Sequence, residues 1–442
     1  MKRPGDLAVP GAESARLAAW LLVAVAVLAV VGDLVPAYPD WLTGVLGWAA
    51  CLLFWPRLKR AQRRVSLLLV LFGAAGILWG TVRGHGGLVN RALTQNMPLV
   101  GMLIAVSFLQ LTGTRRERPD KPLSAGRYAL LATLIGLHLF GAVINFSAVV
   151  IFADRLAARA KLSVDQATAF SQAFIIGAIW SPFYGAMAVA LTFAPAASLA
   201  RMMGIGIPLA AIGILVSWLN LSSRRHGYAR DFVGYPLHLE ALWVPGVLAL
   251  SVLALHELKP AWSVLTVITL MAPAVTALTL LVREGRRSGA SLLSIVRTRL
   301  PEMGGETTLF MAAGVLSAGM AGVIAVLDFG MPFSRYGAFE ASITSGLILI
   351  AAWLGFHPVI LGMVAGTWIA PLDPDPNLLA MTLLIPWAFG LPGCPMANTL
   401  IAIQARYETP MRELLRRNRI FGLQMFGFCV AMLYLYEWLA GR

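Results

Sequence analysis

Long runs of apolar residues, separated by short polar or charged segments, extend through almost the whole chain. A run of about 17–25 apolar residues can cross the hydrocarbon core of a membrane as one helix. Two apolar segments, one near residue 140 and one near residue 355, fit hairpins better than simple crossings. The pattern predicts an all-α polytopic membrane protein with two re-entrant hairpins and 11 transmembrane helices, at residues 17–35, 41–55, 65–82, 92–112, 166–193, 202–221, 239–256, 262–282, 307–327, 378–403 and 421–439.

The hairpins follow from the positions of the charged loops. Strongly basic loops are expected on the cytoplasmic side, and they lie at residues 57–64, 114–127, 222–230, 283–299 and 406–419. Three apolar segments separate the second loop from the third, so three crossings would put them on opposite sides. The conflict disappears if the first of these segments enters and leaves on the cytoplasmic side. This topology predicts a cytoplasmic N-terminus and an external C-terminus.

Two apolar segments are interrupted by proline and glycine. Residues 389–398 read Phe-Gly-Leu-Pro-Gly-Cys-Pro-Met-Ala-Asn, and residues 176–186 contain a weaker copy. Gly177 and Gly390 are 213 residues apart, as are Pro182 and Pro395. Lipid cannot satisfy the backbone groups that such breaks release, so the breaks must face protein or water. Paired broken helices in two halves of a chain indicate the binding site of a secondary transporter.

The same arrangement divides the chain into an inverted repeat. Residues 1–91 are expected to form a scaffold or a homodimer surface, and residues 222–306 to connect the two halves. The first repeat would span residues 92–221, and the second residues 307–442. Each repeat would hold a hairpin and a broken helix, at residues 128–153 and 166–193 in the first and at 338–371 and 378–403 in the second.

Composition supports a membrane location. Of 442 residues, 58% are hydrophobic and 13% are charged, whereas soluble domains are about a quarter charged. The 35 Lys and Arg exceed the 21 Asp and Glu, but they fall in short loops that orient the chain. We therefore expect membrane lipid and a small solute as partners, and no nucleic acid. The three cysteines are isolated, so no metal site is expected.

The order of span, hairpin and broken helix resembles the ion transporter superfamily, and its pattern is similar to that of the divalent anion:sodium symporters. Those proteins carry Ser-Asn-Thr at each hairpin tip and a proline-rich break after each hairpin. Residues 388–398 are similar to the second break, and Asn145-Phe-Ser147 stands at the first tip. The second tip reads Gly355-Phe-His-Pro358 and lacks Ser-Asn-Thr. The resemblance implies elevator-like transport of a small anionic solute, driven by a sodium or proton gradient across the plasma (inner) membrane.

Polar and helix-breaking residues near the tips and breaks are the candidate site. N-terminal ends of half-helices suit an anion, and their C-terminal ends and unwound carbonyls suit a cation. His357 could either carry a coupling proton or serve as a hydrogen-bonded structural residue, whereas His138, deeper in an arm, is expected to be structural. A sodium ion could bind at Asn145, Ser147 and Asn398. The candidate substrate- and ion-binding residues are Asn145, Ser147, Ser181, Pro182, His357, Gly393, Pro395, Asn398 and Thr399.

Other functions remain open at the level of sequence. A sodium/proton antiporter or a metalloid exporter would share this architecture. A membrane-embedded lipid-linked transferase would need a catalytic group of residues, and none is recognisable: His256-Glu257 lacks the second histidine of HExxH, and no GxSxG occurs. We therefore expect no enzymatic activity, no catalytic residues and no cofactor other than the coupling ion.

Overall fold

The computed structural model describes residues 12–113, 123–223, 229–234, 243–327 and 333–441. Helices make up nearly all of these residues, so the expected all-α polytopic membrane fold is confirmed. The described part also holds one small ladder that the sequence did not predict. It pairs β1 (Ser124–Ala125) antiparallel to β2 (Val233–Gly234).

Nine helices of the described part are long and apolar enough to cross a membrane. One of them, Arg127–Ile144, belongs to the first expected hairpin, and the others match expected spans. Three expected spans are missing from the nine because their helices are shorter. The helix at Trp41–Phe54 has 14 residues and the helix at Trp243–Leu258 has 16. The expected span 166–193 is divided by a break.

The chain forms two compact units, which are described separately. Unit 1 draws on residues 1–111 and 261–329. Its α-helices are α1 (Ala12–Leu34), α2 (Trp41–Phe54), α3 (Arg60–Val82), α4 (Leu88–Thr94), α5 (Met97–Ser107), α12 (Val264–Glu284), α13 (Ser288–Thr298) and α14 (Gly304–Leu327).

Glycine allows α3 and α14 to pack closely within unit 1. A Cβ atom at Gly73 would lie 2.5 Å from the carbonyl oxygen of Val315, and one at Gly76 would lie 2.5 Å from that of Gly319. Small residues that let backbones approach are typical of helix pairs in membranes. This pair therefore depends on its glycines for its separation.

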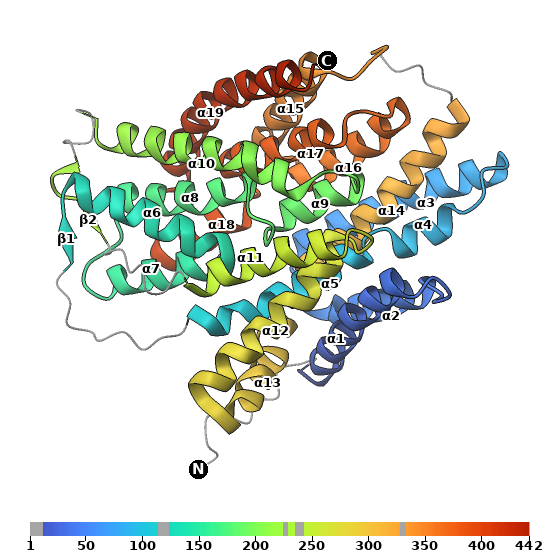
Figure 1. The fold of residues 1–442 in the computed structure, drawn as a ribbon, viewed down its shortest axis with the longest axis horizontal. Helices are drawn as coiled ribbons and strands as arrows, with labels where there is room; N and C mark the ends of the chain where they lie inside the picture. The colour runs from blue at the N-terminus through green and yellow to red at the C-terminus, as the bar shows by residue number, and fades with distance from the viewer. Residues whose placement is uncertain (1–11, 114–122, 224–228, 235–242, 328–332, 442) are drawn as a thin grey trace. The chain divides into compact units, whose positions relative to one another are not determined.

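Unit 2 draws on residues 112–260 and 330–442. Its α-helices follow one order twice, a helix pair, then a broken helix, then a long helix (Figure 1). The first set is α6 (Arg127–Ile144), α7 (Ser147–Ala157), α8 (Val164–Ile176), α9 (Gly185–Phe193) and α10 (Leu199–Leu221). The second set is α15 (Ala338–Trp353), α16 (Pro358–Ile369), α17 (Pro376–Ile385), α18 (Asn398–Tyr407) and α19 (Met411–Leu439). Helix α11 (Trp243–Leu258) stands between the two sets in the sequence.

Both broken helices begin at strong N-terminal caps. Ser163 accepts a hydrogen bond from the Gln166 amide (3.1 Å), and the Gln166 side chain accepts one from the Ser163 amide (2.9 Å), which forms a capping box at α8. The Asp375 carboxylate accepts bonds from the amides of Asn377 and Leu378 (3.0 Å each) at α17. Local sequence therefore fixes where these helices start.

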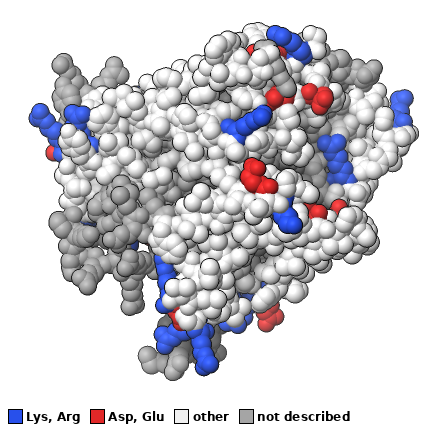
Figure 2. All heavy atoms as spheres, in the orientation of Figure 1, with Lys and Arg blue, Asp and Glu red and all other residues white. Residues whose placement is uncertain are grey.

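The surfaces of several helices are apolar. On α3, Phe72 is 68% exposed and Leu78 is 66% exposed, and on α19 Leu423 is 63% exposed. Figure 2 shows a face on which most atoms belong to uncharged residues and the charged side chains form small groups. Lipid, rather than water, is the solvent that such a surface suits.

Candidate functional site

The first helix pair turns at Asn145. Its φ of 57° is positive, which is uncommon for residues other than glycine and is seen more often for asparagine than for most. The Asn145 amide donates to the Gly141 carbonyl (3.1 Å), and the Asn145 side-chain oxygen accepts from the Phe146 amide (3.0 Å). Ser147 is half-buried and starts α7. The side-chain oxygen of Asn145 is thus used within its own turn.

The first break is tied to this turn. Between α8 and α9 the chain forms a 3₁₀ turn at Gly177–Ile179 and then leaves the helical path. Ser181, followed by the buried Pro182, donates its hydroxyl to the Ala142 carbonyl (2.5 Å) and accepts from the Phe183 amide (3.3 Å). Ser181 therefore joins the end of α6 to the break.

His138 has both ring nitrogens engaged beside the same break. Its Nε2 accepts a hydrogen bond from Trp180 Nε1 (3.1 Å), which assigns the proton to Nδ1. Nδ1 then donates to the Ala173 carbonyl (3.2 Å). This arrangement is that of a neutral histidine with a structural role.

The second helix pair is separated by residues 354–357. His357 caps α16, and its Nδ1 accepts from the Val359 amide (3.2 Å). The imidazole lies edge-on to Trp387 of the second break, with ring centroids 6.1 Å apart. The sulfhydryl of Cys394 approaches the Phe356 carbonyl (3.8 Å). The second tip is therefore also packed against the break of its own half.

The second break is longer than the first. After α17 the chain forms a π-helical turn at Pro386–Gly390 and a 3₁₀ turn at Leu391–Gly393. A further turn, closed by a hydrogen bond from the Ala397 amide to the Cys394 carbonyl (3.1 Å), leads into α18. Each turn begins at or next to a proline, which lacks the N–H that a continuous α-helix needs. The predicted residues differ in burial: Gly393 is buried, Thr399 is half-buried, and Pro395 and Asn398 are exposed.

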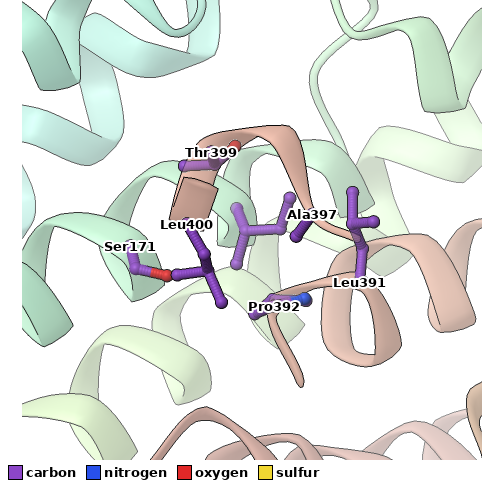
Figure 3. Close-up of a pocket in the computed structure, with 7 residues that line it drawn as sticks. Ser171, Leu391, Pro392, Ala397, Thr399 and Leu400 are labelled. Atoms are coloured by element: carbon purple, nitrogen blue, oxygen red, sulfur yellow. The ribbon is translucent and has the colours of Figure 1, made fainter. Parts of the chain in front are cut away.

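The two breaks meet inside unit 2. Helix α9 packs on α17, and the turn Gly177–Ile179 contacts the turn Pro386–Gly390. Beside this crossing lies a cavity of about 10 Å³, which is close to the space that one water needs. Figure 3 shows Ser171 of α8 facing the chain from the second break into α18 across this cavity. Its lining residues are Ser171, Ile175, Leu391, Pro392, Ala397, Thr399 and Leu400.

A buried polar network continues from the cavity. Asn418 of α19 is fully buried and donates to the Ser171 hydroxyl (3.0 Å). Gln172 donates to the side-chain oxygen of Asn418 (3.2 Å) and accepts from the Ser217 hydroxyl (2.8 Å). Sequence reasoning missed these residues, although Ser171 and Gln172 lie within a predicted broken span. The sequence pattern places Asn418 in a basic loop, whereas the structure starts α19 at Met411.

Not all of the predicted site residues come together. Thr399 lines the cavity, Ser181 and Pro182 lie at the first tip and break, and His357 and Gly393 lie at the second. Within the ranges that the structure describes, no hydrogen bond joins Asn145 to Asn398.

An ion pair links the two sets of helices at the end of α7. Arg406 binds Asp154 with two hydrogen bonds, Nε to Oδ1 (2.8 Å) and Nη2 to Oδ2 (2.7 Å), and the Tyr407 hydroxyl donates to Oδ1 (2.7 Å). Partial burial raises the pKa of the Asp154 carboxyl, but the bonds from Arg406 and Tyr407 and the Arg406 charge outweigh it and hold that pKa below its usual value. The pair thus fastens α7 to α18 at neutral pH.

Metal-binding chemistry is not evident in the described residues. No group of three or more His, Cys, Asp or Glu in that part of the chain could hold a metal ion. The polar groups at the breaks are hydroxyls, amides and backbone carbonyls, which suit a weakly bound alkali cation or a hydrogen-bonded solute.

Comparison with known proteins shows a similarity of fold but not of sequence. No protein-family model matches the sequence, and no curated protein matches it. Among solved structures, the chain is similar to the YdaH transporter of Alcanivorax borkumensis, described as having an unusual topology. The two are 13% identical, with a TM-score of 0.54, and the match covers 85% of this chain and 98% of that one. The likeness shows a shared fold, and the apolar helices support an integral membrane protein.

Proposed function

We propose that this integral membrane protein is a secondary active transporter of a small anionic solute, coupled to a sodium or proton gradient. The observation that carries the proposal is the crossing of two broken helices in unit 2, each packed against the tip of its own helix pair. Such crossings create backbone groups without helical partners near the middle of a membrane. A fold shared with a transporter adds support.

The crossing offers groups for both kinds of ligand. Helices α7, α9, α16 and α18 all begin at a tip or a break, and helix N-termini favour anions. Helices α6, α8, α15 and α17 all end at a tip or a break, and their carbonyls favour a cation. The arrangement could therefore bind an anionic solute together with its coupling ion.

The transport step that we propose is an elevator-like, rigid-body movement of the part that carries both helix pairs. The compactness of unit 2, which holds both helix pairs and both breaks, supports this mechanism. The internal ties at Ser181 and at the Asp154–Arg406 pair would keep the moving part together. We place the protein in the plasma (inner) membrane with its N-terminus in the cytoplasm and its C-terminus outside.

Uptake into proteoliposomes tests the proposal. The purified protein would be reconstituted, and small carboxylates and inorganic oxyanions would be screened under a sodium gradient, a proton gradient or neither. We expect uptake of at least one class that depends on one gradient. Empty liposomes and Gly393→Ala, a variant altered in the second break, provide the controls.

Two results would contradict the proposal. Absence of gradient-dependent flux for every solute class, in protein shown to be folded, would exclude secondary transport. Cation flux that depends on pH without any organic or oxyanion solute would instead indicate a sodium/proton antiporter.

A further inference from the structure

The second tip and the second break share one cationic side chain, Arg419 of α19. Arg419 Nη2 donates to the Trp353 carbonyl (2.6 Å), and Arg419 Nε donates to the Gly393 carbonyl (3.0 Å). Among the described residues these two oxygens are its hydrogen-bond partners, and it makes no ion pair with a carboxylate there. Arg419 is half-buried, 8 residues into α19.

Both acceptors are carbonyls at the ends of helical segments. Trp353 is the last residue of α15, and Gly393 is the last residue of the 3₁₀ turn in the second break. Their oxygens have no following helical N–H to bind, and helix C-termini carry partial negative charge. Two such ends pointing at one place form the environment that suits a cation.

The first set of helices has no cationic side chain at the position equivalent to Arg419. Gly206 of α10 stands 213 residues before Arg419, the same spacing that relates the glycines and prolines of the two breaks. It has no side chain, and a Cβ atom there would lie 2.7 Å from the Cβ of Trp180. Near the end of α6, the carbonyl of Ala142 is bound by the neutral hydroxyl of Ser181 and not by a cation.

We propose that Arg419 is a built-in cation, whose guanidinium occupies the place between the Trp353 and Gly393 carbonyls that a sodium ion would otherwise fill. The chain thereby supplies a fixed positive charge at the second tip. Within the proposed transport function, on which this consequence rests, the second half contributes no exchangeable coupling ion. Any coupling ion would then bind in the first half.

Thermal unfolding of the purified full-length protein tests the proposal without measuring transport. Arg419→Ala and wild type would be compared in sodium chloride and in choline chloride of equal ionic strength. We expect the variant to melt below wild type in choline, and to gain about 2–4 °C more than wild type in sodium, as a newly formed sodium site is filled. An equal sodium response in the two proteins would overturn the proposal.

Further variants separate charge from hydrogen bonding. Arg412→Ala removes a positive charge from an exposed position in the first turn of the same helix, so it should keep the wild-type sodium response. Arg419→Lys keeps the charge and should gain no sodium response, whereas Arg419→Gln keeps donors without charge and should gain one. If Arg419→Ala does not fold in either salt, the comparison of Arg419→Lys with Arg419→Gln tests the proposal in its place. Identical behaviour of Lys and Gln would show that Arg419 acts only as a hydrogen-bond donor.

Chemical rescue gives an independent readout. Millimolar methylguanidinium should raise the Tm of Arg419→Ala and leave wild type and Arg412→Ala unchanged, because only the first variant has an empty guanidinium site. No rescue, combined with no added sodium response, would exclude a cation site there. These results stand whether or not the reconstituted protein transports any solute, so they separate this proposal from the proposed function.

Discussion

The hydroxyl of Ser181 lies 2.5 Å from the carbonyl oxygen of Ala142, and so joins the first break to the end of α6. Both residues are buried. Because a buried carbonyl that loses its partner is costly, the Ala142 carbonyl depends on this hydroxyl.

Replacing Ser181 with alanine should loosen this junction. We expect a loss of about 1 kcal/mol in stability, the usual effect of one side-chain hydrogen bond between membrane helices, and a lower uptake rate. Thermal unfolding in detergent and proteoliposome uptake would measure the two effects. Ser181→Thr keeps the hydroxyl and is the matched control. If alanine and threonine variants are equally stable, the hydrogen bond does not hold the break.

Gly393→Ala should abolish transport while leaving the protein inserted in the membrane. A Cβ atom at this position would lie 2.7 Å from Trp353 Cδ1 and 2.8 Å from Arg419 Cγ, so both side chains would have to move. Pro395 is exposed, and Pro395→Ala should have a smaller effect on uptake. Uptake assays with quantified reconstitution would check both. Unchanged kinetics for Gly393→Ala would count against a site at the second break.

Thr399→Val removes a hydroxyl from the wall of the cavity without changing its shape. We expect little change in Tm and about a tenfold rise in the KM for solute, the effect of losing one contact of about 1.4 kcal/mol. Concentration dependence of uptake gives the KM. The neighbouring variant Asn398→Ala provides the comparison. If Asn398→Ala changes the KM and Thr399→Val does not, the ligand binds on the exposed side of the break.

The Asp154–Arg406 pair predicts a pH-dependent contribution to stability. The pKa of Asp154 is lowered in the folded protein, so its contribution is present above the ordinary value of 3.8 and is lost as pH falls through the lower folded pKa. Asp154→Asn should therefore lower the Tm at pH 7 but match wild type increasingly below about pH 4. Melting curves between pH 3 and pH 7 would test this. A difference that stays constant over that range would contradict it.

The residues that end the helices were visible in the sequence because their effects are local. Pro386, Pro392 and Gly393 disturb the helix in which they stand, whatever surrounds them, and they lie in or next to the predicted break. Asn145 is likewise suited to a turn by its own side chain. The start of α19 was harder to predict. The structure begins this helix at Met411, but in the sequence the arginines of its first turns resemble a charged loop.

Contacts between distant segments could not be derived in the same way. Asn418 reaches Ser171 across 247 positions of sequence, and nothing in either local pattern names the partner. Arg419 reads as one more positive charge in a basic segment, yet it binds carbonyls at a helix end and at a break.

The sequence by itself determined that this chain is a helical membrane protein with two interrupted segments, because hydrophobic length and helix-breaking residues act locally and are set by the solvent. Only the tertiary structure decided which polar groups meet at those interruptions. It brings Ser171 and Thr399 to one cavity, leaves Asn398 exposed, and places Arg419 at the second break. The physical reason is that a hydrogen bond or an ion pair requires two groups within about 3 Å, and packing alone brings them that close.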